Sequence, residues 1–269
     1  MELKGRTILV TGASGGIGHH IAEELHARGA RVVATGRDEE RLHAVPATAH
    51  VTCDLRDAAA TEGLVDRAEA AAGPLDGLVL CAGVEHTGAY AAESIAELEE
   101  IVRVNLTAPM ILVRTALPGM LRRARGHVVG VSSISGRGPS PYLASYATTK
   151  AAIRELMASL RLEHRGTGVS FSSVSPGFVA REGMYARMAE TGHRAPFALG
   201  TSPPERVATA VVDAFEHDKA DRIVAARPMR PLFALNELTP KAGDAGVLAV
   251  GARRFLRNVA TARGRGPTG

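Results

Sequence analysis

The chain has 269 residues, of which 45% are hydrophobic and 22% charged, a balance that excludes an intrinsically disordered or fibrous protein. The length fits one large α/β domain or at most two small ones. The formal net charge of +4 comes from the segment after residue 226, where eight Lys and Arg residues stand against two acidic ones. No recognisable nucleic-acid-binding module accompanies these charges, so the sequence argues against a nucleic-acid partner.

Three features of the sequence favour a cytoplasmic protein. The first residues lead straight into an apolar segment without a charged leader, so we expect no signal peptide. No uninterrupted apolar run approaches the roughly 18 residues of a membrane-spanning helix. The two cysteines, Cys53 and Cys81, each end an apolar run and are expected to be buried, reduced thiols.

Short apolar runs alternate with helical patterns from the start of the chain. The expected strands are 7–10, 31–35, 49–53, 77–81, 127–131, 169–174 and 222–225. The expected helices are 17–27, 58–71, 94–123 and 143–164, with a late helix that Ser202 caps at its start. This alternation predicts an α/β fold, a Rossmann-type doubly wound parallel sheet of about seven strands with helices on both faces. Ligands of such sheets bind beyond the carboxyl ends of the strands.

A glycine-rich loop joins the first strand to the first helix, with the sequence Thr11-Gly12-Ala13-Ser14-Gly15-Gly16-Ile17-Gly18. Gly12 permits a sharp turn off the strand, Gly16 removes a Cβ atom that would hold a pyrophosphate away, and Gly18 permits close packing of the helix. The helix N-terminus offers free N–H groups to phosphate oxygens. A glycine-rich turn without a ligand is the alternative, and the position between strand and helix favours a dinucleotide site.

Tyr146 and Lys150 are four residues apart at the start of a predicted helix, so their side chains lie on one face. A phenol with a pKa of about 10 is a poor base near neutrality. An ammonium group at about 4 Å would favour the phenolate and bring the phenol towards the working pH. Such a pair alone is common on solvated helices, so its meaning depends on the surrounding motifs.

The glycine spacing resembles the T-G-x-x-x-G-x-G of the short-chain dehydrogenases, and other residues extend the resemblance. Ser133 precedes a glycine by three residues and Tyr146 by thirteen, as the family's catalytic serine does, and Asn105 matches its fourth catalytic residue. The resemblance implies that Tyr146 exchanges a proton with the substrate oxygen and that Ser133 stabilises charge on that oxygen. It implies that Lys150 lowers the pKa of the phenol and holds the nicotinamide ribose, and that Asn105 supports a water that links Lys150 to solvent.

The resemblance also implies a set of cofactor-binding residues: Gly12, Ser14, Gly16, Ile17, Gly18, Arg37, Asp54, Leu55, Ala82, Gly83, Tyr146, Lys150, Pro176, Gly177 and Val179. Two departures from the family pattern stand out. Leu80 and Cys81 replace two asparagines that tie the central sheet together in the family. Arg181 replaces a threonine that holds the carboxamide, which leaves this task to the backbone of Val179 or turns Arg181 towards a 2′-phosphate or an acidic substrate.

The end of the second strand distinguishes NADP from NAD. An acidic residue there binds both ribose hydroxyls of NAD and repels a 2′-phosphate, whereas a basic residue pairs with that phosphate. This chain has Gly36 at the position of the acid, followed by Arg37, and we therefore predict NADP, with NAD less favoured. Asp38 is interpreted as the N-cap of the next helix.

We expect residues 1–227 to form the dinucleotide-binding and catalytic domain, including a mobile lid at 178–201. Within the lid, the apolar side chains either line a substrate pocket or pack a small helix; they are Met184, Tyr185, Met188 and Phe197. Residues 228–269 are expected to be a basic C-terminal extension of the same domain. Its apolar segment 228–235 is hypothesised to close over a lipophilic substrate or to rest on a membrane surface.

The sequence thus predicts an NADP-dependent oxidoreductase that transfers a hydride between NADP(H) and a carbonyl or secondary alcohol, with a small and apolar substrate. The alternatives are a non-catalytic NADP-binding sensor or scaffold, and an epimerase or dehydratase on the same fold. Those last relatives usually differ in glycine spacing and have a longer C-terminal domain. The resemblance implies a homodimer or homotetramer. The ten histidines show no metal-ligand spacing, so we predict no metal.

Overall fold

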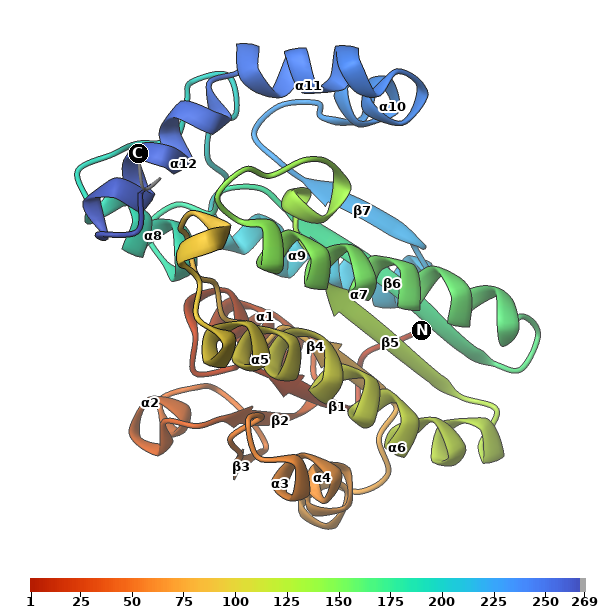
Figure 1. The fold of residues 1–269 in the computed structure, drawn as a ribbon. Helices are drawn as coiled ribbons and strands as arrows, with labels where there is room; N and C mark the ends of the chain where they lie inside the picture. The colour runs from red at the N-terminus through yellow and green to blue at the C-terminus, as the bar shows by residue number, and fades with distance from the viewer. Residues whose placement is uncertain (267–269) are drawn as a thin grey trace.

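The computed structural model describes residues 1–266 and contains one seven-stranded parallel sheet of order β3-β2-β1-β4-β5-β6-β7 (Figure 1). The strands are β1 (Thr7–Thr11), β2 (Arg31–Gly36), β3 (Ala49–Thr52), β4 (Gly77–Leu80), β5 (Gly126–Val131), β6 (Val169–Pro176) and β7 (Asp221–Val224). The strand order reverses between β1 and β4, where doubly wound sheets open a ligand crevice. The predicted Rossmann-type fold is confirmed.

Helices cover both faces of the sheet because side chains alternate along each strand. In β1, Ile8 and Val10 point to one face and Leu9 to the other. The first face packs against α1 (Gly16–Ala27), α2 (Glu39–His43) and α9 (Pro204–His217). The second packs against α3 (Ala58–Glu62), α4 (Leu64–Ala72), α6 (Ala108–Arg122) and α7 (Ala144–Glu163).

The long helical region predicted over 94–123 is a continuous rod with a wider turn in its middle. It runs from α5 (Ile95–Val102) through a π-helical turn, η2 (Arg103–Thr107), into α6, and a short 3-10 turn, η1 (Tyr90–Ala92), precedes it. This rod is 28 residues long, and an 18-residue window of it has a mean hydropathy of 1.2, so by length and composition it could cross a membrane. Part of that apolar surface, including Leu112 and Met120, is buried in the core, and core helices of globular proteins are apolar too.

Two helix boundaries differ from the sequence-based expectation. The helix expected over 58–71 is divided into α3 and α4 at Gly63. The expected Ser202 cap is wrong: α9 begins at Pro204 with Pro203 as its N-cap, and the buried Ser202 hydroxyl has no hydrogen-bond partner. The physical reason is that the Ser202 backbone pairs with Val179 in an isolated parallel bridge, which places this residue before the helix.

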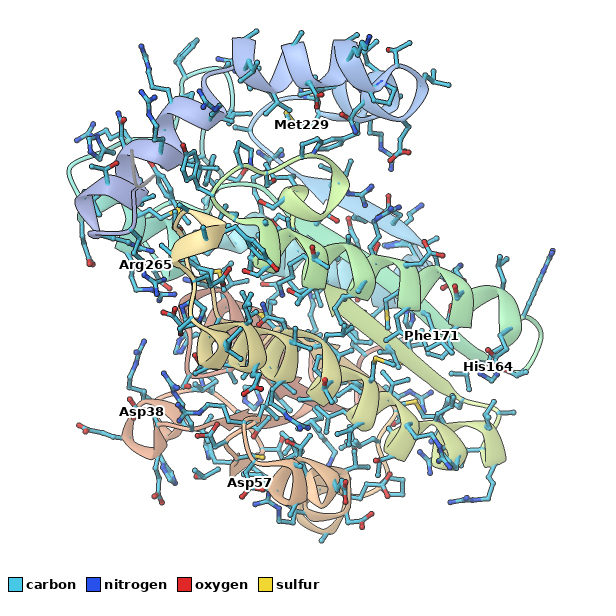
Figure 2. All side chains as sticks on the ribbon, viewed as in Figure 1. Asp38, Asp57, His164, Phe171, Met229 and Arg265 are labelled. Carbon is cyan, nitrogen blue, oxygen red and sulfur yellow. The ribbon has the colours of Figure 1, made fainter. Side chains whose placement is uncertain are left out.

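The lid and the C-terminal extension pack on each other above the carboxyl ends of β5 to β7. The lid contains α8 (Gly183–Ala189), and the extension contains α10 (Arg230–Leu238), α11 (Pro240–Ala249) and α12 (Ala252–Ala262). Figure 1 shows α10 and α11 together at one end of the molecule and α12 beside α8. Phe255, Leu256 and Val259 of α12 join Met188 of the lid and Tyr146 of α7 in a third apolar cluster. Figure 2 places Met229 beneath α10 and α11.

Candidate active site

A cavity of about 420 Å³ runs along the carboxyl ends of β1, β2, β4, β5 and β6. Every residue predicted to bind the cofactor lines it, from the glycine loop through Arg37, Asp54 and Leu55 to Val179. Ser133, Tyr146 and Lys150 line the same cavity at its β5–β6 end. Residues that are far apart in the sequence therefore line one continuous cavity. Of the predicted site residues, Asn105 alone does not line it.

The glycine loop has the shape that a pyrophosphate needs. Gly12 has a φ of +69°, and a Cβ atom there would lie 2.8 Å from the Cα atom of Ala82. At Gly18 a Cβ atom would lie 2.1 Å from the carbonyl oxygen of Gly12, so any side chain would push α1 away from the loop. Helix α1 begins after Gly15 with no side-chain cap and no acidic residue in its first turn. Its first N–H groups are thus available to an anion, and the loop fits a dinucleotide.

A lid residue lies over this loop at Gly16. A Cβ atom on Gly16 would be 2.3 Å from Oε2 of Glu182, and Oε1 of Glu182 is 3.5 Å from Nε2 of His20. The open space above Gly16 that we expected for a pyrophosphate is therefore occupied by a carboxylate. An anionic side chain at a helix N-terminus is electrostatically favoured for the same reason that a phosphate is.

At the other end of the cavity, the carboxyl end of β2 lies close against the glycine loop. A Cβ atom on Gly36 would lie 2.4 Å from Oγ of Ser14 in the glycine loop. Arg37 follows, exposed at the cavity rim, and Asp38 accepts a hydrogen bond of 3.0 Å from the Arg41 N–H. Asp38 is thus the N-cap of α2, as predicted (Figure 2).

Two further arginines that the sequence motifs did not indicate line this end of the cavity, Arg41 and Arg56. The Arg56 guanidinium binds the Asp54 carboxylate, with Nε 3.0 Å from each oxygen, and this hydrogen bonding lowers the pKa of Asp54. The signal for Arg41 was its position in the short helix that Asp38 caps, close behind Arg37 in the sequence. Three arginines, Arg37, Arg41 and Arg56, therefore line the end of the cavity near the carboxyl end of β2.

Two asparagines that stabilise the central sheet in the family are missing from this chain, and Thr11 makes the connection in their place. Its hydroxyl accepts hydrogen bonds from the N–H groups of Cys81 and Ala82, at 3.0 and 3.1 Å, and donates one to the carbonyl of Val79 at 3.2 Å. One buried hydroxyl thus connects β1 to the loop after β4. Cys81 itself is a thiol whose pKa burial raises to about 11, so it is neutral.

Ser133 is positioned by a 3-10 turn, η3 (Ile134–Arg137), that packs directly on α7. A Cβ atom on Gly136 would lie 2.6 Å from backbone atoms of both Lys150 and Ala151, so only glycine permits this contact. The Ser133 Oγ caps the turn by accepting from the Ser135 N–H at 3.1 Å. This packing holds the serine hydroxyl beside the first turns of α7, where Tyr146 and Lys150 lie.

Tyr146 and Lys150 are both buried, with 9% and 4% of their surfaces exposed. Burial raises the pKa of the Tyr146 phenol well above its usual value, and the adjacent Ser133 hydroxyl opposes that rise. Burial lowers the pKa of Lys150 to about 8. The Lys150 ammonium donates to the carbonyl of Val131 at 3.0 Å and lies 5.8 Å from the centre of the Tyr146 ring. The expected lowering of the phenol pKa by the ammonium is not found in this arrangement, where burial dominates.

Asn105 occupies the π-helical turn between α5 and α6 and is 1% exposed. Its amide exchanges two hydrogen bonds with the backbone of Val84, at 2.8 and 2.9 Å, and donates to Oγ1 of Thr149 at 3.2 Å. The side chain therefore joins the loop after β4 to the helix that carries Tyr146 and Lys150. This geometry makes Asn105 a positioning residue, with its amide engaged by protein groups.

The segment after β6 closes the nicotinamide end of the cavity. Gly177 donates to the carbonyl of Val224 at 2.8 Å, and the bridge to Ser202 uses the Phe178 carbonyl and the Ala180 N–H on either side of Val179. Arg181 turns away from the cavity and binds Glu205 at 2.9 Å. Of the alternatives for the carboxamide, this orientation favours the backbone of Val179.

The lid contributes three of the four predicted pocket residues. Met184, Tyr185 and Met188 line the cavity, but Phe197 does not: it is 86% exposed and stacks against the Arg227 guanidinium at 4.6 Å. Its position beyond α8 places it on the outer side of the lid. Within residues 1–266 no cluster of three or more His, Cys, Asp or Glu side chains is arranged for a metal ion.

Comparison with known proteins identifies the family. Residues 6–192 match the family model described as short chain dehydrogenase. The chain belongs to this family. It is accordingly an NAD(P)-dependent oxidoreductase, and the convergence of the glycine loop with Ser133, Tyr146 and Lys150 agrees with that membership.

Several relatives within the family carry the names of ketoacyl reductases. The ketoacyl reductase HetN of Nostoc sp. is 34% identical over 255 residues, which cover 90% of this chain and 88% of the relative. The 3-oxoacyl-[acyl-carrier-protein] reductase of Rickettsia conorii is 32% identical over 78% of this chain and 89% of its own length. One similar solved structure is a 3-oxoacyl (acyl-carrier-protein) reductase from Agrobacterium tumefaciens with NADP bound. It is 30% identical in sequence and superposes with a TM-score of 0.73, and the match covers 82% of this chain and 93% of that chain.

Proposed function

We propose that this protein uses NADP(H) to interconvert an apolar ketone and the corresponding secondary alcohol. The observation that carries the proposal is the single cavity that joins two chemically distinct ends. One end has a glycine loop and three arginines, and the other has Ser133, Tyr146 and Lys150. A dinucleotide laid along this cavity would bring its nicotinamide to the proton-donating end, as in doubly wound sheets generally.

The preference for NADP is supported by the charge at the β2 end. A 2′-phosphate is dianionic, and charge-assisted hydrogen bonds from guanidinium groups recognise it. Arg37, Arg41 and Arg56 line the cavity there, whereas Asp54 is already paired with Arg56. The relative of known structure that binds NADP supports the same choice.

The protein's own groups then have defined tasks in the reaction. NADPH supplies the hydride when it is bound. Tyr146, held protonated by burial, donates a proton to the carbonyl oxygen, and Ser133 donates a hydrogen bond to the same oxygen and stabilises its developing charge. Lys150 would hold the nicotinamide ribose hydroxyls. Gly177 and Val179 would hold the nicotinamide ring against the sheet, and Asn105 would keep α7 in place.

The test is consumption of NADPH by the purified protein with a panel of aliphatic, aromatic and 3-oxoacyl ketones. We expect absorbance at the reduced-nicotinamide band to fall with at least one class and to fall more slowly with NADH. Tyr146→Phe is the control, and it should abolish turnover while leaving NADPH binding nearly unchanged. Substantial activity of Tyr146→Phe would refute the proton donor. NADPH binding without consumption of any ketone would favour a non-catalytic sensor or scaffold.

The family resemblance also supports a homodimer or homotetramer formed through the helices that follow β4 and β5. Val102 and Met110 on the α5–α6 rod and Leu162 on α7 are exposed by 44%, 48% and 75%, which provides apolar surface on those helices. Light scattering should then give a multiple of 28.1 kDa, and Met110→Asp should lower it. The cytoplasmic location and the membrane contact of residues 228–269 stay predictions.

A further inference from the structure

A second cavity of about 70 Å³ lies beneath the C-terminal helices, and we call it the tail cavity. Its floor is the loop between β5 and α7, with Gly138, Pro139 and Pro141. Its roof is apolar and comes from the C-terminal extension: Met229, Leu232, Phe233, Val247, Val250 and Leu256. The polar side chains of its lining are Ser135, Ser140 and Asn236, and the buried Oδ1 of Asn236 has no hydrogen-bond partner within residues 1–266. The rest of the lining is apolar, and small apolar cavities accept apolar ligands.

The tail cavity adjoins the proton-donating end of the active site. Ile134, Ser135, Leu143 and Phe178 line both cavities and form their common wall. Ile134 directly follows Ser133, and Leu143 lies immediately before the helix that carries Tyr146. The nucleotide would approach from the glycine loop on the other side. The tail cavity therefore begins where the substrate carbonyl, and not the cofactor, would lie.

One residue of the common wall connects the lid to the C-terminal helices. The Phe178 ring packs against Tyr185 of α8 with ring centres 5.2 Å apart, and edge-on against Phe255 of α12 at 5.5 Å. Aromatic contacts of this geometry stabilise packing beyond their buried area. A substrate group that passes Phe178 would thus contact the lid and the C-terminal extension together.

We propose that the tail cavity receives the unbranched alkyl tail of the substrate while its carbonyl lies between Ser133 and Tyr146. The substrate class is then a ketone with a linear aliphatic chain. An apolar cavity of about 150 Å³ accepts benzene, and a space half that size holds a narrow alkyl chain more readily than a ring. This inference rests on the proposed function, because it assumes that a ketone is the substrate. It assigns chain-length selection to α10–α12.

The first test is a series of unbranched methyl ketones of increasing length, assayed with NADPH. We expect kcat/KM to rise about fourfold for each added methylene until the cavity is full, as burial of one methylene predicts. Val247→Phe fills the cavity and should abolish this rise. Leu248→Phe is the matched control, because Leu248 is the next residue of α11 and is 57% exposed. It should keep the wild-type profile.

A reciprocal variant covers the case in which Val247→Phe does not fold. Phe233→Ala enlarges the cavity and should move the plateau to longer ketones. A chain-length profile that is flat in the wild type, or identical in the wild type and both cavity variants, overturns the proposal.

A binding test separates the tail cavity from catalysis. Unbranched secondary alcohols of the same lengths should raise the melting temperature of the NADPH-bound protein, in which they cannot be oxidised, in proportion to chain length, since ligands stabilise the state that binds them. Val247→Phe should remove this dependence and Leu248→Phe should keep it. If no ketone is reduced yet this pattern appears, the proposed reaction fails and the cavity assignment stands. Equal shifts for all lengths overturn the assignment itself.

Discussion

The carboxylate of Glu182 lies over Gly16, so close that a Cβ atom at position 16 would be 2.3 Å from its Oε2 atom. Gly16 begins α1, whose first N–H groups are the expected site of the cofactor pyrophosphate. The lid carboxylate and a pyrophosphate would therefore compete for the same helix N-terminus, and binding of the dinucleotide requires that Glu182 move away.

Removal of this carboxylate should strengthen cofactor binding. For Glu182→Ala we expect the Kd for NADPH to fall by about two- to fivefold, the usual range for a charge at a helix N-terminus. Glu190→Ala is the control, because Glu190 is exposed at the C-terminal end of the same lid helix. Fluorescence titration of NADPH measures both. An unchanged or raised Kd for Glu182→Ala would show that the carboxylate does not compete.

Arg37 should determine the choice between NADPH and NADH. We expect Arg37→Asp to weaken NADPH by roughly 10- to 100-fold, the loss of one hydrogen bond between charged groups, while NADH changes little. Arg31→Asp is the matched control: Arg31 is exposed at the opposite end of the same strand, away from the cavity. Kd values for both nucleotides check the result, and an equal effect on both would remove Arg37 from phosphate recognition.

The parts of this site that the sequence predicted are those encoded by local spacing. The glycine loop needs a turn directly after a strand, and Tyr146 and Lys150 share one helical face because they are four residues apart. Gly136 explains why the family spacing from Ser133 is kept, since a side chain there would collide with the backbone of Lys150. These requirements act over a few residues, so they leave a readable pattern.

The parts that escaped prediction depend on contacts between distant segments. Nothing near Thr11 in the sequence indicates that its hydroxyl takes over the role of two missing asparagines. Arg56 reaches the adenosine end because β3 lies beside β2, and Phe197 faces solvent because α8 ends before it. The tail cavity likewise forms only when three short C-terminal helices fold back on the loop after β5.

The pH dependence of kcat/KM for NADPH should follow the ionisation of Lys150 rather than that of Tyr146. Tyr146 has a raised pKa and stays protonated across the neutral range, whereas Lys150, with a pKa of about 8, loses its charge above that pH. We therefore expect kcat/KM for NADPH to decline above about pH 8. Lys150→Arg, which stays charged, should move this decline to higher pH at a reduced rate. Lys219→Arg, an exposed lysine, is the control and should leave the profile unchanged. A decline at the same pH in Lys150→Arg would assign it to another group.

His127 should make the fold sensitive to acid. It is 3% exposed in β5, its Nε2 lies 2.8 Å from Oγ of Ser172, and its ring packs edge-on against Phe215 at 5.1 Å. Burial lowers the pKa of His127 to about 4. Between about pH 6.5 and pH 4 the unfolded chain binds a proton that the folded chain does not, so stability is lost as the pH falls through this window.

The contribution of His127 can be isolated by subtraction. From urea unfolding at several pH values, we expect the wild type to lose up to about 3 kcal/mol more than His127→Gln between pH 6.5 and pH 4, since each pKa unit is worth about 1.4 kcal/mol. The difference removes the background from carboxylates, which both proteins share. His26→Gln, an exposed residue in the last turn of α1, should follow the wild type. Parallel curves for the wild type and His127→Gln would mean that His127 is protonated in the fold, with Asp218, 4.0 Å from its Nε2, as the stabilising partner.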